Sequence, residues 1–581
     1  MDKHTPGGRR AQPTGSNEHG PRYEWTFTEA SKTDPVELRL QPVAFLPVVF
    51  VPGIMGTNLF NPTVADPKKG RVWNVDGSGD AFGGAFRSPG GRQAELHFAR
   101  TQVYEHGKVP DERSQTGLNN DQDYWERGWG EIGYMSYGEF LLWLERTLNA
   151  PAGATRQATL MSQLTTALGP QATQAPAGWQ AARPFDPLKA DELTQANRWL
   201  MPVYACGYNW LGDNAEAAQR LQSRINTIIA KHHDGRFAFC KQVVLISHSM
   251  GGLVARACQA LPGMQHKIAG VLHGVMPTVG APVAYRRCKV GMGDEGPSGL
   301  GLAATKAWGA AKVIGMSGQH VTPVFAQSPG ALQLLPSQAH PPGWLRITGP
   351  DGRDLYPPLP SANPYDEIYR ERIRWWGLVR EEWLRPRGSR FQMDFSTFKD
   401  KHLTRAEDFH KAVGLDHFHP CTYAFYGHGG QSEAGPIQSF ESVQWRVLPG
   451  KRPGAPPLQQ VAQLTHDQVC LDGSNPEHIG KTVTPVLTEK TYSEAVDVVE
   501  EWHYELRATG PEPGGDGTVN RRSAAAVGQG ARRVKQVFTL PDIAHEPAYK
   551  SLFAQRLVVY AVLKISAQAI NPLPFSQVQK P

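Results

Sequence analysis

A serine lies where an apolar strand pattern turns directly into a helix. Residues 243–246 read VVLI, residues 247–251 read SHSMG, and an apolar helical pattern follows at once. This is the strand–turn–helix setting of the nucleophile elbow G-x-S-x-G, with Ser247 in place of the first glycine. Because the sharp turn presents the central hydroxyl, the pattern predicts that Ser249 is the nucleophile of an acyl transfer. The alternative is a glycine-rich turn in which Ser249 only caps the helix.

Acyl transfer also needs two preorganised N–H donors for the developing oxyanion. The first is expected from the backbone of Met250, which follows the nucleophile. The second is expected from the sequence PGIMG at residues 52–56, which follows the first apolar run. There Ile54 carries the N–H group and Gly53 lets the backbone approach. The alternative is that PGIMG is only a tight turn.

The acid and the base are sought after the serine, since the expected chain order is Ser, Asp or Glu, then His. Asp516 lies in the polar turn GGDGTV, and His545 is the one histidine that follows it. We expect His545 to take the Ser249 proton and pass it to the leaving alcohol, while Asp516 fixes the imidazole. A DGT sequence by itself is also a common turn.

Other acids and histidines compete for these roles. Glu433 directly follows an apolar strand pattern, and Asp542 lies three residues before His545. Asp542 is expected to orient the loop, whereas Glu433 stays an alternative acid. His248, inside the elbow, is expected to pack or to hydrogen-bond locally, and His428 is a candidate for lining the pocket.

Several buried strands must position these residues. Apolar runs that end in turns alternate with helical patterns, which predicts an α/β fold with a mostly parallel central sheet. The site is then expected at the carboxyl ends of the strands. The predicted strand-and-turn segments are residues 43–53, 201–210, 241–249, 270–282, 422–430 and 534–545, and the clearest helices are 214–233, with an Asn214 cap, and 548–565.

Long insertions divide the chain. We expect a flexible arm at 1–37, a first part of the core at 38–282 with an insertion at about 60–200, a cap or lid at 283–418, and a second part of the core with the acid and base at 419–581. Such insertions project over the site and carry specificity. The segment 300–345 is a candidate mobile lid.

The cap also holds tryptophans beside arginines. Residues 371–384 mix Trp375, Trp376 and Trp383 with three arginines. This mixture suits a lipid interface. The alternative is a helix packed on the core with a solvated basic edge.

Composition and motifs argue against several classes of protein, namely nucleic-acid-binding, metal-dependent and membrane-spanning ones. The chain has 581 residues and a net charge of +6 without a Lys/Arg block, so no nucleic-acid partner is expected. None of its six cysteines forms a CxxC pair, and we expect neither a metal nor a cofactor. No stretch is long enough to span a bilayer. The polar N-terminal segment has no apolar signal core, so any export is expected by another route.

Four sequence blocks together resemble the lipases of the α/β-hydrolase fold, in particular the branch of lecithin:cholesterol acyltransferase and the GPI inositol-deacylases. The blocks are FVPGIMGTNL, SHSMGGLVARA, TYAFYGHGG and GGDGTV. In that branch a VPG-x-x-G loop supplies the oxyanion hole and a DGTV-type loop supplies the acid. The chain departs from the pattern at Ser247, where most members have glycine.

The chain resembles more specifically the lipase effectors of bacterial type VI secretion. This resemblance implies a phospholipase A-type toxin that is made in the bacterial cytoplasm, is exported with a spike or tube component of the secretion system, and acts on membrane phospholipids in the periplasm of a target cell or at host membranes. It also implies a cognate immunity protein. The alternatives are an acyltransferase, a carboxylesterase that is not a toxin, or a catalytically silent scaffold of the same fold.

Overall fold

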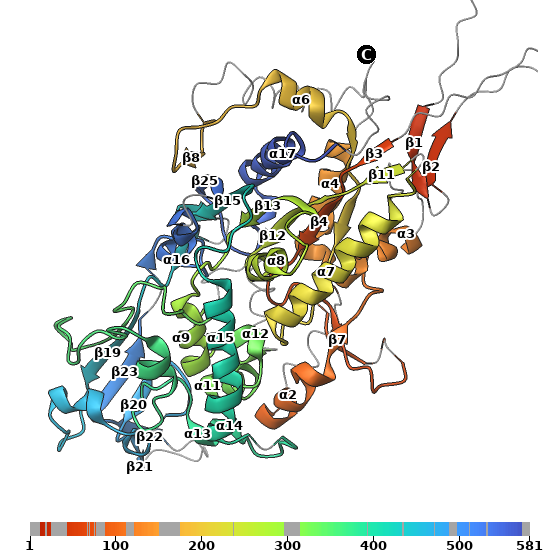
Figure 1. Cartoon of the computed structure of the whole chain (residues 1–581). Coiled ribbons are helices and arrows are strands. Elements are labelled where there is room, and N and C mark those ends of the chain that lie inside the picture. The colour runs from red at the N-terminus through yellow and green to blue at the C-terminus, as the bar shows by residue number, and fades with distance from the viewer. Residues whose placement is uncertain are drawn as a thin grey trace, which may run out of the picture.

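The structure is a computed structural model of the chain (Figure 1). It describes residues 12–17, 20–24, 43–66, 68, 70–74, 76, 88–111, 121–149, 175–235, 238–295, 314–391, 393–432, 435–469, 471–486, 497–509, 512–529 and 533–571.

A seven-stranded sheet forms the centre of the molecule, and only its edge pair, β25 and β8, is antiparallel. In spatial order its strands are β10 (Val203–Ala205), β4 (Val48–Val51), β12 (Val243–His248), β13 (Ile268–Gly274), β15 (Thr422–Gly427), β25 (Val534–Leu540) and β8 (Gln180–Ala181). The prediction of an α/β-hydrolase fold with a mostly parallel central sheet is confirmed. The edge strand β8 was not predicted, because two residues carry no periodic signal.

Helices cover both faces of this sheet because its strands are apolar on both sides (Figure 1). In β4, Val48 and Phe50 pack into a core with α4 (Tyr134–Leu148) and α17 (Leu552–Ser566). Val49 and Val51 point to the opposite core, which holds α7 (Asn214–Lys231) and α8 (Gly251–Ala260). The result is a three-layer sandwich with the carboxyl ends of the parallel strands at one edge.

The predicted boundaries shift at two places. The apolar run 43–51 splits into β3 (Val43–Phe45) and β4 around Pro47, whose nitrogen has no hydrogen to donate. The predicted Asn214 cap is wrong, because the Asp213 side chain accepts from the backbone N–H of Ala215 at 2.8 Å and caps α7. Asn214 is fully buried in the first turn.

A second body lies beside the hydrolase sheet, at the lower left of Figure 1. Its sheet consists of β14 (Leu345–Thr348), β19 (Val443–Pro449), β23 (Tyr504–Ala508) and β20 (Glu477–Ile479). β14 belongs to the predicted cap, whereas its partner β19 follows the predicted boundary at residue 418. Residues 300–313 of the predicted lid lie outside the described residues.

The tryptophans of the second body are core residues. Trp375, Trp376 and Trp383 are buried, and the Nε1–H groups of the first two donate to the carbonyls of Val461 and Ala462 at 2.8 and 2.9 Å. Of the two readings of this segment, the tryptophans follow the alternative of packing on the core, and they do not form a lipid-contacting face. The sequence mixture was ambiguous because tryptophan is as common in a core as at an interface.

Smaller elements complete the described chain. The remaining strands are β1 (Gln12–Asn17), β2 (Gly20–Glu24), β5 (Leu59–Phe60), β6 (Arg71–Trp73), β7 (Gln102–Val103), β9 (Trp199–Leu200), β11 (Ala238–Cys240), β16 (Gln431–Ser432), β17 (Gly435–Pro436), β18 (Gln438–Ser439), β21 (Thr482–Val486), β22 (Asp497–Glu501) and β24 (Glu512–Pro513). The remaining α-helices are α2 (Pro89–Glu95), α3 (Asp121–Glu126), α6 (Ala190–Ala196), α9 (Pro282–Val290), α11 (Gly318–Phe325), α12 (Pro329–Leu332), α13 (Glu381–Leu384), α14 (Phe395–Thr397), α15 (Thr404–Val413) and α16 (Arg521–Ala525). The 3₁₀ and π turns are η2 (Phe98–Arg100), η3 (Trp129–Glu131), η4 (Tyr365–Tyr369), η5 (Phe398–Leu403), η6 (Leu458–Gln463), η7 (His466–Gln468), η8 (Ala526–Gln529) and η9 (Ala548–Lys550).

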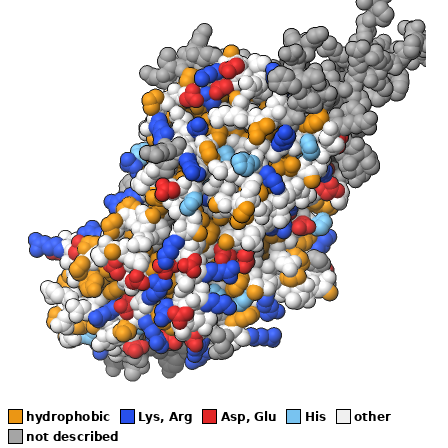
Figure 2. Space-filling model, viewed as in Figure 1, with side chains coloured by type: hydrophobic (Ala, Val, Ile, Leu, Met, Phe, Trp, Pro, Cys, Tyr) orange, Lys and Arg blue, Asp and Glu red, His pale blue; other side chains and the backbone are white. Residues whose placement is uncertain are grey.

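The surface carries both signs of charge. Acidic and basic side chains are interspersed over the face in Figure 2 rather than separated into patches of one sign. Around α15, Glu407 pairs with Arg370 and with Lys411, and Arg405 pairs with Asp213. Within the described ranges, no helix has both the length and the apolar character needed to cross a bilayer.

Candidate active site

Ser249 sits in a strained turn between β12 and α8. Its φ is +52°, a value that side-chain-bearing residues rarely adopt, and its N–H donates to the carbonyl of Gly274 at 2.9 Å. A Cβ at Gly251 would come within 2.4 Å of the carbonyl oxygen of Pro52, so only glycine fits there. Strand and helix thus pass closely at this turn. Ser249 directly follows β12 at the carboxyl end of the sheet, as the elbow pattern predicts, and 4% of its surface is exposed.

The predicted acid, base and nucleophile lie in one hydrogen-bonded row. Oγ of Ser249 is 2.8 Å from Nε2 of His545, and Nδ1 of His545 is 2.8 Å from Oδ2 of Asp516. Since the carboxylate only accepts, Nδ1 of a neutral His545 carries the hydrogen and Nε2 is free to accept the Ser249 proton. The structure therefore brings together three residues that are up to 296 positions apart in the sequence.

Backbone donors hold the Asp516 carboxylate in place. Its Oδ1 accepts from the N–H groups of Thr518 at 3.0 Å and of Val519 at 2.7 Å, which leaves Oδ2 to face His545. The backbone N–H of His545 also donates to the carbonyl of Asp516 at 2.7 Å. The GGDGTV turn and the loop after β25 are therefore joined through backbone as well as side-chain contacts.

The structure describes three of the four competing residues, and His248 is treated below. Asp542 accepts from the backbone N–H of Gln431 at 2.7 Å, so its carboxylate orients a neighbouring loop, as expected. His428 is exposed. Glu433 lies outside the described residues.

The two predicted oxyanion donors flank the nucleophile. In the described part of the chain, no protein acceptor is bound to the backbone N–H of Ile54 or of Met250. A Cβ built on Gly53 would lie 3.0 Å from Cβ of Ser249, so the loop before Ile54 backs directly onto the serine. An oxyanion hole requires two such N–H groups without a protein acceptor near the nucleophile, so Ile54 and Met250 stay the predicted donors.

Two histidines of the site differ in their surroundings. His248 is buried, and its Nε2 lies 2.8 Å from the carbonyl oxygen of His545. Burial, assisted by the neighbouring His545, lowers the pKa of His248 to about 3. His248 is therefore neutral in the functional pH range, while the side chain of His545 keeps 12% of its surface exposed.

Two tyrosines at the site were not predicted. The hydroxyl of Tyr137, from α4, lies 2.9 Å from Nδ1 of His248, and the hydroxyl of Tyr549 donates to the carbonyl of Ser247 at 2.7 Å. Both are buried, and burial raises the pKa of each well above its usual value. Only the apolar period of α4 marked Tyr137, and that period does not distinguish a core tyrosine from a site tyrosine.

The site lies where the two bodies meet. Ile54, Ile314 and Leu334 are partly buried and pack against the core of the second body as well as against the α7/α8 side of the hydrolase core. The loop that carries Ile54, the predicted second oxyanion donor, is therefore bordered by apolar side chains of both bodies. An acyl chain favours such surroundings.

Comparison with known proteins agrees with this architecture. A family model described as "PGAP1-like alpha/beta domain" matches residues 211–291, which include the elbow and β13. A chain in the structure titled "The crystal structure of Tle4-Tli4 complex" is similar, with a TM-score of 0.68 and 26% identity, over 91% of this chain and 100% of that one. No curated protein sequence matches the chain. The chain thus resembles a PGAP1-like α/β-hydrolase at its elbow and a chain of the Tle4–Tli4 structure over most of its length.

Proposed function

Starting from an α/β-hydrolase fold with Ser249, His545 and Asp516 aligned at the edge of its sheet, we propose that the protein is a serine esterase that cleaves acyl esters of membrane phospholipids. The observation that carries the proposal is the pair of 2.8 Å contacts from His545, one to the nucleophile and one to the acid. Apolar side chains around Ile54 support an acyl substrate.

The reaction follows from the geometry. Oγ of Ser249 bonds to the ester carbonyl carbon while its proton moves to Nε2 of His545, and the oxyanion accepts from the N–H groups of Met250 and Ile54. The carbon–oxygen bond to the glycerol then breaks, and the imidazolium gives its proton to that oxygen. Water then attacks the acyl-enzyme: its oxygen bonds to the acyl carbon as its proton moves to Nε2 of His545. The bond from that carbon to Oγ of Ser249 breaks, Oγ takes the proton back from the imidazolium, and the fatty acid leaves. Asp516 stabilises the imidazolium throughout.

The test is fatty-acid release from phosphatidylethanolamine liposomes by the purified protein. We expect release by the unmodified chain and its loss in Ser249→Ala. Tributyrin and p-nitrophenyl esters are tested in parallel. If only the phospholipid is not cleaved, the proposed substrate is wrong but the proposed ester hydrolysis stands. If no acyl ester is cleaved, the chain is a scaffold and the proposal is wrong.

We further propose that this activity serves as an antibacterial toxin. The sequence resemblance to type VI lipase effectors is the ground for this role and for export together with a spike or tube component. The similarity to a chain of the Tle4–Tli4 complex supports neutralisation by a cognate immunity protein. Expression targeted to the periplasm should arrest growth, whereas cytoplasmic expression should be milder. Ser249→Ala is the control in both compartments, and equal toxicity in both would contradict the proposal.

A further inference from the structure

A series of hydrogen bonds joins the Gly53–Ile54 loop, called the oxyanion loop below, to His545 without passing through Ser249. The backbone N–H of Gly53 lies 3.3 Å from the Tyr137 hydroxyl, which lies 2.9 Å from Nδ1 of His248, and Nε2 of His248 lies 2.8 Å from the carbonyl oxygen of His545. The four residues come from the loop after β4, from α4, from the elbow, and from the loop after β25.

The direction of each bond in this series is fixed. A carbonyl oxygen only accepts, so Nε2 of His248 carries the hydrogen that is donated to His545. Nδ1 of the neutral ring must then accept, and the Tyr137 O–H donates to it. The Tyr137 oxygen is left to accept from Gly53. Each of these groups therefore has one donor–acceptor orientation that pairs it with its neighbours. Because Tyr137 and His248 are buried, water does not replace these partners.

Packing leaves little room for other arrangements. A Cβ on Gly53 would lie 2.7 Å from Nδ1 of His248, and a Cβ on Gly56 would lie 2.9 Å from the Tyr137 hydroxyl. The two glycines of the VPG-x-x-G loop therefore make space for the two ends of the Tyr137–His248 bond. The Tyr137 ring also packs on Phe50 of β4, with ring centroids 4.9 Å apart.

We propose that His248 is a positioning residue which, held by Tyr137, sets the places of His545 and of the Gly53–Ile54 loop relative to Ser249. This inference rests on the proposed esterase function. His248 touches neither substrate nor a transferred proton. Its contribution is to hold base and oxyanion donor in register, since misplacement of reacting groups by about 1 Å can cost about 100-fold in rate.

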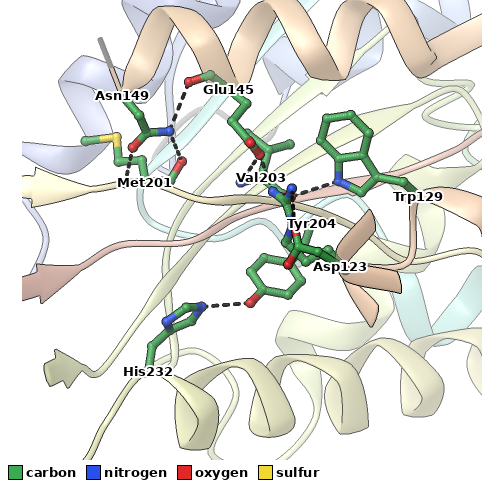
Figure 3. A network of polar contacts seen from close by, with 9 residues as sticks. Asp123, Trp129, Glu145, Asn149, Met201, Val203, Tyr204 and His232 are labelled. Atoms are coloured by element: carbon green, nitrogen blue, oxygen red, sulfur yellow. Dashed lines mark hydrogen bonds and ion pairs between the residues drawn. The ribbon is translucent and has the colours of Figure 1, made fainter. Parts of the chain in front are cut away.

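The structure supplies a matched control away from the site. The Tyr204 hydroxyl lies 2.7 Å from Nε2 of His232, and this pair is also buried, between β10 and the end of α7 (Figure 3). Burial lowers the pKa of His232 to about 3, as it does for His248. Tyr204→Phe therefore removes a buried tyrosine–histidine bond, as Tyr137→Phe does, without touching the site.

The experiment compares kcat and KM for a soluble p-nitrophenyl ester across four variants, with Tm measured for each. His248→Leu should lower kcat about 10- to 100-fold at unchanged KM. His248→Gln, whose amide can place a donor near the lost Nε2, should recover most of that loss. Tyr137→Phe removes the bonds to His248 and to Gly53 and should lower kcat about tenfold, the effect of one or two neutral hydrogen bonds. Tyr204→Phe should lower Tm about as much as Tyr137→Phe and leave kcat unchanged.

A second measurement separates this inference from the proposed function. In protein labelled with ¹⁵N-histidine, the low-field proton between Nδ1 of His545 and Asp516 should shift or vanish in His248→Leu and persist in Tyr204→Phe. If the unmodified chain cleaves no ester, the proposed function fails and this resonance alone decides the positioning role. If kcat and the resonance in His248→Leu match those of Tyr204→Phe, His248 is a packing residue and the inference is wrong.

Discussion

The Ser247 hydroxyl lies 2.8 Å from Nδ1 of His273, its register partner on the adjacent strand, and both residues are buried. This contact explains how a serine takes the place of the first elbow glycine. The hydroxyl forms a hydrogen bond with a neighbour in β13. Serine in place of the first glycine is thus accommodated by its bond to His273, and the Ser249 turn still forms.

Restoring the glycine should therefore destabilise this chain. Ser247→Gly removes the partner of a buried imidazole and adds backbone freedom in a strand, which together cost about 1–3 kcal/mol of unfolding free energy. The kcat of the folded protein should hold. Urea unfolding and ester hydrolysis measure the two effects. Unchanged stability would mean that the Ser247–His273 bond contributes nothing.

The identity of the acid can be tested by amide substitutions. Asp516→Asn keeps the shape but lets the His545 ring adopt the wrong tautomer, so kcat should fall by about 10⁴-fold. Asp542→Asn should have little effect on kcat, because Asp542 contacts Gln431 and not His545. Glu433→Gln is also predicted to be mild. If Glu433→Gln proves the more damaging change, the assignment of Asp516 is overturned.

The oxyanion loop should not tolerate a methyl group. Gly53→Ala places a Cβ 2.7 Å from His248 and 3.0 Å from the Ser249 Cβ, so the loop must move away and kcat should fall about 100-fold. Gly528→Ala is the control, since a Cβ there meets nothing within 4 Å. Steady-state kinetics and Tm distinguish a misplaced donor from an unfolded chain. Equal kcat in both variants would argue that Ile54 supplies no donor.

Stability should fall as the solution is acidified below about pH 6.5. Burial lowers the pKa of His232, His248 and His273 to about 3. Between pH 6.5 and 3 the unfolded chain binds protons at these rings and the folded chain does not. Each ring thus removes about 1 kcal/mol between pH 7 and 5.5.

Buried carboxyls with a raised pKa, among them Asp123 and Glu131, act in the opposite direction. Burial raises the pKa of Glu477 to about 8, so its contribution grows as the pH falls. Burial also lowers the pKa of His340, His402 and His410 to about 4, so the histidines outweigh the carboxyls. Urea unfolding at pH 7.0 and 5.5 should therefore show a net loss of stability. Proton uptake on unfolding at pH 5.5 is an independent check. Equal stability at the two values would show that these rings are protonated in the folded chain.

The sequence alone determined much of the fold and of the candidate site. Strand-to-helix alternation predicted the parallel sheet, because apolar periodicity is a local property. Chain order then selected His545, since a single histidine follows Asp516. The predicted roles of Ser249, Asp516 and His545 needed only a local motif, a turn and this order.

Tertiary structure decided what depends on contacts between distant segments. Nothing local in α4 marks Tyr137 as a neighbour of His248, 111 positions away. The tryptophans at 375, 376 and 383 were assigned to a core only by the strands and turns packed around them. Likewise, only the register between β12 and β13 shows that the hydroxyl of Ser247, where the elbow pattern has glycine, has His273 as its partner. Periodicity records which side of an element is buried, whereas the partner buried against it is set by the packing of the whole chain.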